Sequence, residues 1–228
     1  ANFPFQSYFG LDSTAGGFRT NDGNSIGIGD FSFFAKYKFL KKEKLSAAFI
    51  AGIKVPTGNT NQKNEFGFLL SPDLQPGSGS WDPILGLSVS KKFDHLVLHS
   101  NILYKLSTGG KQDTTIGDSV NFNLGLSKKI LKGKIFNKQI LPSQIFGQNL
   151  SWNIFAEANG IWREKVEANG VKDPNHGGLV ILLTPGFKLG INDRVYNTVF
   201  MSFPVFQELN GIQSDLAFQL GFNTSLIF

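Results

Sequence analysis

The feature that most constrains the fold is a repeated alternation of apolar and polar residues, and it is longest at the end of the chain. Over residues 215–228, every second residue from Leu216 onward is apolar apart from one threonine, and the residues between them are largely polar. This pattern predicts a β-strand with one apolar face. At ~3.3 Å per residue and a tilt of ~45°, these 14 residues cover about 32 Å, close to the hydrocarbon thickness of a membrane. Globular strands average about 5 or 6 residues, so the length favours a membrane-crossing strand.

Ten segments in all carry this alternation, which predicts an antiparallel all-β fold. An even number of strands is typical of bacterial outer-membrane barrels, whose two chain ends then lie on the same side. The connections alternate between long polar loops and short turns, as such a barrel requires. The ten segments are residues 2–10, 30–39, 45–55, 81–90, 96–106, 120–127, 152–163, 179–189, 194–205 and 215–228.

One connection, residues 128–150, breaks the alternation of loops and turns. It falls where a short turn is expected, but it is long and contains Ile130, Ile135, Phe136, Ile140 and Leu141. These residues suggest a hidden hairpin, which would raise the number of strands to twelve.

The composition excludes a helical membrane topology. No apolar run approaches the ~18 residues that a spanning helix requires. The mean hydropathy of −0.07 would suit a soluble protein, but a barrel also averages near neutral because only alternate residues face lipid. The chain has no cysteine, which removes disulfides and thiolate metal sites. We predict one domain over residues 1–228, an antiparallel transmembrane β-barrel of twelve strands, ten of them clear by pattern, with short periplasmic turns and long extracellular loops.

Aromatic residues gather at both ends of the predicted strands. Two such rings are typical of a barrel embedded in a bilayer, whereas a soluble barrel has its apolar face inside and needs neither. The turn-side ring is Tyr37, Phe39, Phe93, Trp152 and Phe228, and the loop-side ring is Trp81, Tyr104 and Trp162.

The residues that alternate with the apolar face are predicted to line the lumen. One interpretation is that they hydrate the lumen and pair with one another, because a buried charge needs compensation. The other is a permeation path, in which these side chains and the inward Phe34, Phe155 and Phe200 set size and charge selectivity. The predicted pore-lining residues are Lys36, Lys38, Lys54, Asp82, His99, Asn101, Lys105, Asn121, Asn123, Glu157, Arg163, Lys188, Arg194, Gln219 and Asn223.

The net charge of +5 leaves two interpretations open. The first is ordinary surface lysine at the turns, and the second is a lumen biased toward anions. Ten or twelve strands predict a narrow passage, because about eight strands leave a filled interior and 16 to 18 an open channel. The candidate constriction is the apolar part of the long loop after the third strand, formed by Phe66, Phe68, Leu69 and Leu70.

Several short runs, taken in order, resemble the bacterial family named for the meta-pathway of phenol degradation. The runs are GIGDFSFFAKYKF at 27–39, IKVPTGN at 53–59, SKKF at 90–93, HSNILYKL at 99–106, IGDSVNFNLGLSKK at 116–129 and FAEANG at 155–160. The resemblance implies a narrow outer-membrane channel of about twelve strands for passive diffusion of small molecules, often hydrophobic or aromatic.

Other functions were weighed against a channel. A serine hydrolase would need a histidine beside a serine, but His99 and Ser100 face opposite sides of a strand. His176 lies in a loop near Asp173 and Asn175, which could hold a metal, although a lone loop histidine is more often only solvated. No known catalytic motif is present, so we predict no enzyme, no metal and no cofactor. A structural or ligand-binding barrel that acts through its extracellular loops remains an alternative.

The expected partners and location follow from the barrel. Phe228 resembles the terminal aromatic residue read by the outer-membrane insertion machinery, although it could simply belong to the aromatic ring. We expect a monomer integral to the bacterial outer membrane with both termini periplasmic. It would contact outer-membrane lipid, the insertion machinery and a small-molecule substrate, and no nucleic acid.

Overall fold

The computed structural model describes residues 27–63, 66–134, 149–192 and 194–226, and within these ranges the protein is all-β. Its only helical segments there are two 3-10 turns, η1 (Pro72–Leu74) and η2 (Lys111–Asp113). Over the same ranges, no helix has the length and apolar character to cross a membrane. The antiparallel all-β prediction is therefore confirmed.

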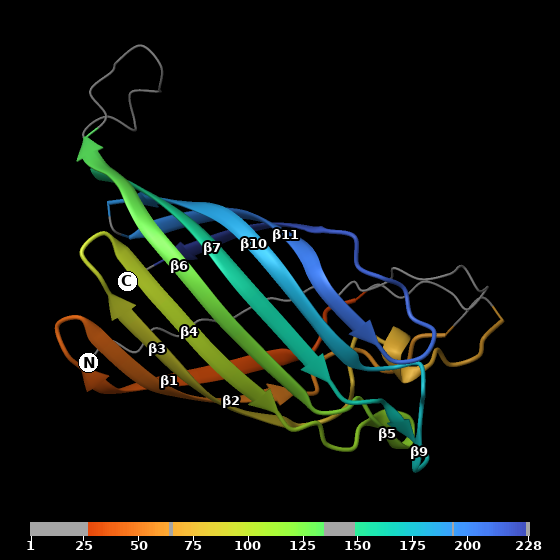
Figure 1. Ribbon diagram of the computed structural model, residues 1–228. Coiled ribbons are helices and arrows are strands. Elements are labelled where there is room, and N and C mark those ends of the chain that lie inside the picture. The colour runs from red at the N-terminus through yellow and green to blue at the C-terminus, as the bar shows by residue number, and fades with distance from the viewer. Residues whose placement is uncertain (1–26, 64–65, 135–148, 193, 227–228) are drawn as a thin grey trace.

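Nine long strands form one antiparallel sheet in which each strand pairs with its neighbour in the chain, as Figure 1 shows. Three short strands, β5 (Thr114–Thr115), β8 (Glu167–Ala168) and β9 (Val171–Lys172), form a second small sheet. In order, the long strands are β1 (Phe31–Lys41), β2 (Leu45–Val55), β3 (Asp82–Lys92), β4 (Leu96–Lys105), β6 (Ser119–Lys134), β7 (Asn149–Arg163), β10 (Gly178–Ile191), β11 (Val195–Leu209) and β12 (Gln219–Leu226).

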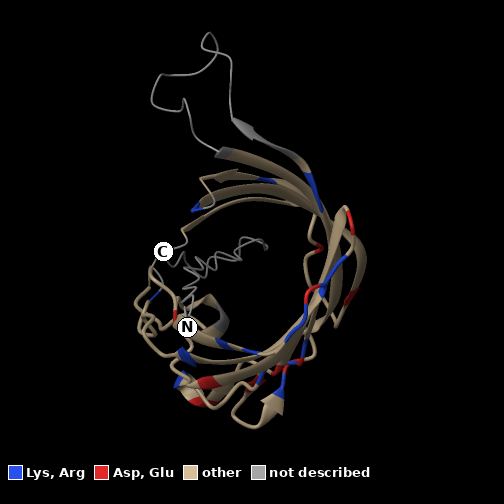
Figure 2. Cartoon of the chain, turned by 90° about the vertical axis from the view of Figure 1, so that its left-hand side faces the viewer, with Lys and Arg blue, Asp and Glu red and all other residues tan. Residues whose placement is uncertain are grey.

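The large sheet is strongly curved, and viewed from one end it follows most of a ring (Figure 2). The turns β1–β2, β3–β4 and β10–β11 lie at one end of the sheet, which we call the turn end. The long connections, with η1, η2 and the small sheet, lie at the opposite end, which we call the loop end (Figure 1). The curvature gives the sheet an inner face, toward the centre of the ring, and an outer face.

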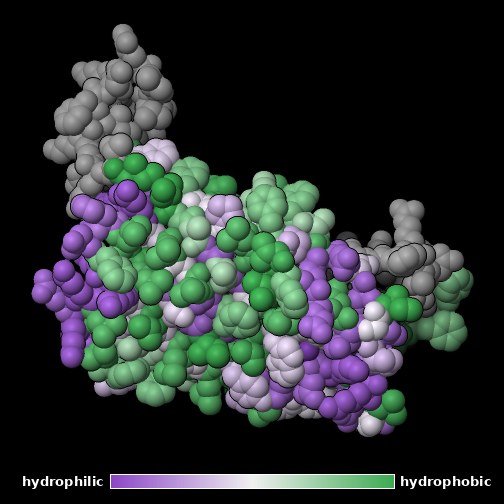
Figure 3. Space-filling view, in the orientation of Figure 1, coloured by the Kyte–Doolittle hydropathy of each residue, from purple (hydrophilic) through white to green (hydrophobic). Residues whose placement is uncertain are grey.

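The outer face carries large apolar side chains that are exposed. Tyr37, Leu85 and Leu220 have exposed fractions of 67%, 63% and 67%. Figure 3 shows apolar residues over the middle of this face and hydrophilic residues toward the turn and loop ends. The two-residue period of the strands places these side chains on one side and their polar neighbours on the other, as the sequence predicted.

On the inner face, aromatic rings lie flat over glycines of the neighbouring strands. Phe155 pairs with Gly186, which pairs with Phe200, which pairs with Gly221. A β-carbon at Gly186 would lie 2.3 Å from Phe155 Cζ, and one at Gly221 would lie 2.0 Å from Phe200 Cζ. Each ring therefore occupies the space that a side chain on the next strand would need, and it lies along the sheet.

The closing strand is shorter than the sequence predicted. The expected strand began at residue 215, whereas β12 begins at Gln219. Pairing with β11 stops at Ser202, just before Pro204, which has no N–H to donate to a neighbour. Beyond this point the Gln207 side chain bridges the gap, since its Oε1 accepts from the Leu216 amide at 2.9 Å and its Nε2 donates to the Leu216 carbonyl at 3.1 Å.

The unusual connection at 128–150 is largely strand at its two ends. β6 continues through Lys134 and β7 starts at Asn149, with a register shift between Lys129 and Leu131. Alternation obscured this continuation because the extra residue at the shift reverses the pattern. The predicted hidden hairpin falls on 135–148, outside the described residues. The predicted first strand at 2–10 and the terminal Phe228 also lie outside them.

Candidate functional site on the inner face

The strand register places most of the predicted pore-lining residues on one surface. Lys38, Asn101 and Asn123 belong to a single row of Cα partners that runs from β1 to β7 through Ala48 and Ser88. The other predicted residues reach this face by the same alternation. By register, the inner face contains Lys36, Lys38, Lys54, Asp82, His99, Asn101, Lys105, Asn121, Asn123, Glu157, Lys188, Gln219 and Asn223.

Two predicted residues lie at the margins of this face. Arg163 is the last residue of β7, at the loop end. Arg194 lies in the exposed turn between β10 and β11, where its amide donates to the Ile191 carbonyl at 3.1 Å. The sequence analysis began this strand at residue 194, but β11 begins at Val195. Arg194 therefore lies in the turn, outside the sheet.

Polar side chains halfway along the inner face form a hydrogen-bonded row across four strands, which we call the mid-wall belt. Asn123 Nδ2 donates to Asn159 Oδ1 at 2.5 Å and to Glu157 Oε2 at 3.2 Å. Asn159 Nδ2 donates to Thr184 Oγ1 at 3.0 Å, and Thr184 donates to Ser202 Oγ at 2.8 Å. These bonds satisfy the polar groups of β6, β7, β10 and β11 that would otherwise lie unpaired near the wall.

His99 extends the belt onto β3 and β4. Its Nδ1 lies 3.0 Å from Ser90 Oγ, and its Nε2 lies 3.3 Å from Ser127 Oγ. Gly125 lies between His99 and Glu157 in the register, and a β-carbon there would lie 2.9 Å from Glu157 Cγ. The glutamate side chain therefore lies over the glycine and reaches toward the imidazole.

Lysines surround the belt. Lys36 of β1, Glu157 of β7 and Lys188 of β10 each interact electrostatically with His99 of β4. β1 and β10 lie on opposite sides of β4 in the order of the sheet, so His99 is influenced by a lysine from each direction. Lys129 pairs with Asn153 in the same row as Lys188. It was not among the predicted pore-lining residues, because the predicted strand ended two residues earlier.

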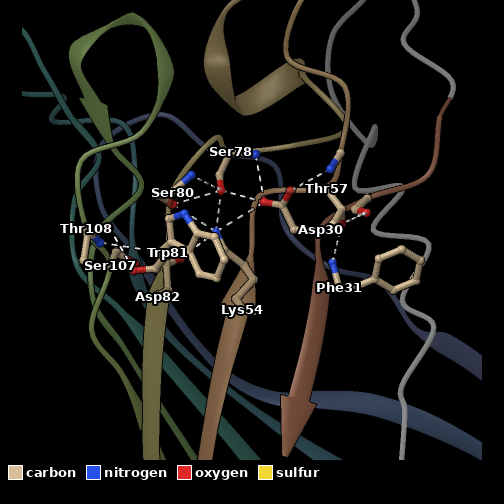
Figure 4. Close-up of polar contacts among 12 residues, drawn as sticks. Asp30, Phe31, Lys54, Thr57, Ser78, Ser80, Trp81, Asp82, Ser107 and Thr108 are labelled. Carbon is tan, nitrogen blue, oxygen red and sulfur yellow. Dashed lines mark hydrogen bonds and ion pairs between the residues drawn. The ribbon is translucent and has the colours of Figure 1, made fainter.

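A buried ion cluster lies at the loop end, as Figure 4 shows. Lys54 Nζ lies 2.5 Å from Asp82 Oδ2 and 3.4 Å from Asp30 Oδ2. It also donates to Ser78 Oγ, and to Ser80 Oγ at 3.1 Å. Asp82 is fully buried, and its Oδ2 accepts no regular hydrogen bond among the described residues, so the ammonium of Lys54 compensates it.

The same cluster attaches two loops to the wall. Asp30 accepts from the Gly58 amide at 2.9 Å, the Ser78 amide at 2.9 Å and Ser78 Oγ at 2.6 Å. Asp82 Oδ1 accepts from the Thr108 amide at 3.0 Å. Burial by itself would raise the pKa of Asp30, but the Ser78 and Gly58 hydrogen bonds and the charge of Lys54 outweigh it and hold the pKa below its ordinary value of 3.8.

Sequence reasoning assigned Lys54 and Asp82 to the lumen but missed their partners. Asp30 and Ser78 lie 48 residues apart, a distance that periodicity within one segment does not reveal. One signal was present, since Ser78, Ser80 and Asp82 continue the two-residue period of β3 backward into the loop.

The chain matches one protein family over most of its length. The model of a family described as "Putative MetA-pathway of phenol degradation" matches residues 3–198, most of the chain. The chain belongs to this family. The resemblance seen in the short sequence runs is thereby confirmed. A search of curated proteins gave no match.

The residues of the predicted constriction differ in their exposure. Leu70 is buried, and its backbone is held by Gln62, Gln75 and Gln112. Phe66 and Phe68 have exposed fractions of 69% and 70%. Leu70 is therefore enclosed within the loops, whereas the two phenylalanines are largely exposed.

A shallow pocket of about 220 Å³ lies where β7 ends. Lys172 Nζ and Glu164 Oε1 form an ion pair of 2.6 Å there, and this contact raises the pKa of Lys172. Arg163 and Lys165 have no acidic partner among the described residues. The pocket is lined by Trp162, Arg163, Glu164, Lys165, Lys172 and Asn210.

The two histidines considered for chemistry make ordinary structural contacts. His99 contacts Ser90 and Ser127, not Ser100. His176 Nδ1 lies 2.9 Å from Asp173 Oδ2, and the Asn175 amide, which donates to Asp173, lowers the pKa of that carboxyl. No group of three or more potential metal-ligating side chains occurs in the described parts of the chain.

Proposed function

We propose that the protein is an outer-membrane channel through which small hydrophobic or aromatic molecules diffuse passively. The distribution of polarity is the observation that supports this most. Among the described residues, six hydrophobic residues are buried, while ten polar or charged residues are buried and large apolar side chains cover the outside. A water-soluble barrel would have the reverse arrangement, whereas a transmembrane barrel has an apolar outer band and a polar lumen.

The ends of the sheet support an orientation in the membrane. Short turns on one side and long connections on the other are typical of the periplasmic and extracellular sides of such barrels. β12 runs to the turn end, since Leu226 pairs with Val195, the first residue after the β10–β11 turn. The C-terminus would then be periplasmic, and the loop-end cluster would lie near the extracellular mouth. In this proposal the protein is a monomer inserted by the outer-membrane assembly machinery.

The inner face is suited to diffusion and not to catalysis. Its polar groups are hydrogen-bonded to one another along the wall, and its phenylalanine rings lie flat over glycines. This arrangement supplies a lining that a small solute can slide along without a deep binding site. A sheet of this size encloses only a narrow lumen.

Two measurements test the proposal. Protein purified in detergent should need an amphiphile to stay monodisperse, and its gel mobility should change on boiling. After reconstitution it should conduct ions across planar bilayers, and small aromatic solutes should enter its liposomes faster than they enter protein-free liposomes. A monodisperse protein in plain buffer would contradict the membrane assignment. A stable barrel without conductance or solute uptake would contradict the channel and leave the loops as the functional region.

A further inference from the structure

The charges of the inner face are unevenly balanced. In the described part of the wall, Lys36, Lys38, Lys129 and Lys188 lie on the inner face by register. Against these lysines, and outside the loop-end cluster, the described inner-face residues supply one carboxylate, that of Glu157. Asp30 and Asp82 hold their negative charge against Lys54 and the surrounding hydrogen-bond donors. The middle and the turn end of the lumen therefore carry an excess of positive charge.

Three of these lysines, Lys36, Lys38 and Lys188, are linked through electrostatic neighbours on the inner face. Lys36 and Lys38 are two residues apart on β1, which places both on the same face, and they interact electrostatically. Lys188 shares His99 as an electrostatic neighbour with Lys36, although the two lysines come from strands far apart in the sheet. Positive charge from several directions in a narrow, low-dielectric passage attracts anions and repels cations.

The cation on β10 lies over an aromatic ring, since Lys188 Nζ is 5.6 Å from the centroid of the Tyr196 ring. Lys188 pairs with Asn153 on β7 and with Thr198 on β11. Two residues further along those strands, Phe155 and Phe200 lie flat over glycines. The inner face around Lys188 therefore combines an ammonium with ring surface from Tyr196 and, on the other side in the register, from Phe155 and Phe200. This combination suits both parts of an aromatic carboxylate, its charge and its ring.

The rim adds a second group of cations. The pocket at the end of β7 contains Arg163, Lys165 and Lys172 against the single carboxylate of Glu164, beside the ring of Trp162. Cations at a channel mouth raise the local concentration of anions there.

From these observations we infer that the channel selects small organic anions, aromatic carboxylates among them, over neutral and cationic molecules of similar size. This inference rests on the proposed channel function and names the charge of its substrates. The lysines of the inner face supply the selectivity, and the phenylalanine rings supply contact area for the aromatic part.

The experiment measures the reversal potential of the reconstituted protein in a KCl gradient and then in potassium benzoate against KCl. The wild-type chloride-to-potassium permeability ratio should exceed one, and benzoate should carry current. The triple variant Lys36→Gln, Lys38→Gln, Lys188→Gln should lower that ratio by roughly 3-fold or more, because it removes charge inside the lumen. Glu157→Gln should change the ratio in the opposite direction.

A matched control removes the same charge outside the lumen. Lys42, Lys44 and Lys91 lie in the β1–β2 turn or on the outer face, and their change to glutamine should leave the ratio within experimental scatter. Heat-dependent gel mobility confirms that each variant is folded. A cation-selective wild type, or a triple variant no different from the control, would overturn the inference while leaving the channel intact. An absence of any conductance would instead count against the channel itself.

Discussion

The inner face carries two groups of charges that are built in opposite ways. In the loop-end cluster, Lys54 and Asp82 have exposed side-chain fractions of 13% and 0%, and each is held by several partners. Beside the mid-wall belt, Lys36 and Lys188 are at least partly exposed and interact with His99 through space. Burial with full pairing makes a charged group structural, whereas exposure with incomplete pairing leaves its field available to a passing solute.

The largest expected effect is the loss of the buried cation. Lys54→Met keeps the length of the side chain but leaves Asp82 and Asp30 uncompensated. Breaking a buried ion pair costs about 3–5 kcal/mol, so the urea midpoint of the protein in lipid vesicles should fall clearly. Lys188→Met is the matched change beside the belt, and it should lower the free energy of unfolding by less than ~1 kcal/mol. Similar losses in the two variants would remove the contrast between the groups.

A second variant pair tests whether compensation is the cause. Adding Asp82→Asn to Lys54→Met removes one of the stranded carboxylates, so part of the lost stability should return. If the loss of unfolding free energy in the double variant equals the sum of the losses in the two single variants, the contact between the two side chains contributes little. The cluster would then not be held together by charge.

A smaller effect is expected where phenylalanine rings lie flat over glycines. Gly186→Ala places a β-carbon against the Phe155 ring, which must then turn away from the wall. Overpacking of this kind costs about 1–3 kcal/mol, and the displaced ring should also reduce single-channel conductance. Gly109→Ala is the control, because no atom lies within 4 Å of its would-be β-carbon. Unchanged conductance in Gly186→Ala would show that the rings do not determine the width.

Strong acid should weaken the loop-end cluster at Asp30. The pKa of Asp30 is lower in the folded protein than its ordinary value of 3.8. Its carboxylate therefore adds stability that is fully present above that value and is lost as the pH falls through the lower folded pKa. We expect amide exchange at Gly58 and Ser78 to speed up below about pH 4. Asp30→Asn should abolish that pH step, and its persistence in the variant would point to another group.

The smallest effect is expected for an exposed pair at the turn end. Lys44 Nζ and Asp94 Oδ1 lie 3.5 Å apart, with side chains that are 64% and 83% exposed. Lys44→Ala should change the free energy of unfolding, measured from the urea transition, by less than ~0.5 kcal/mol, since water and salt screen such pairs. A loss close to that of Lys54→Met would mean that burial does not set the scale of these effects.

The sequence predicted the faces of the strands better than their ends. Alternation placed Lys36, His99 and Glu157 on the inner side because the two-residue period leaves a side chain no other choice. Alternation gave the wrong start for β12, because Pro204 on β11 has no N–H to donate and pairing stops just before it. It also gave the wrong end for β6, because the extra residue after Lys129 reverses the alternation while the strand continues. The partners of Lys54 come from a distant loop, and only the folded chain brings them together.

Lys54 connects parts of the chain that belong to different segments of the loop end. The segment before β1 supplies Asp30, the loop before β3 supplies Ser78 and Ser80, and the loop after β4 is attached through Asp82 and Thr108. These segments therefore form one unit around a single ammonium group. Anyone who wishes to graft a foreign loop onto this scaffold, or to exchange loops between relatives, would have to transplant the set together with its lysine.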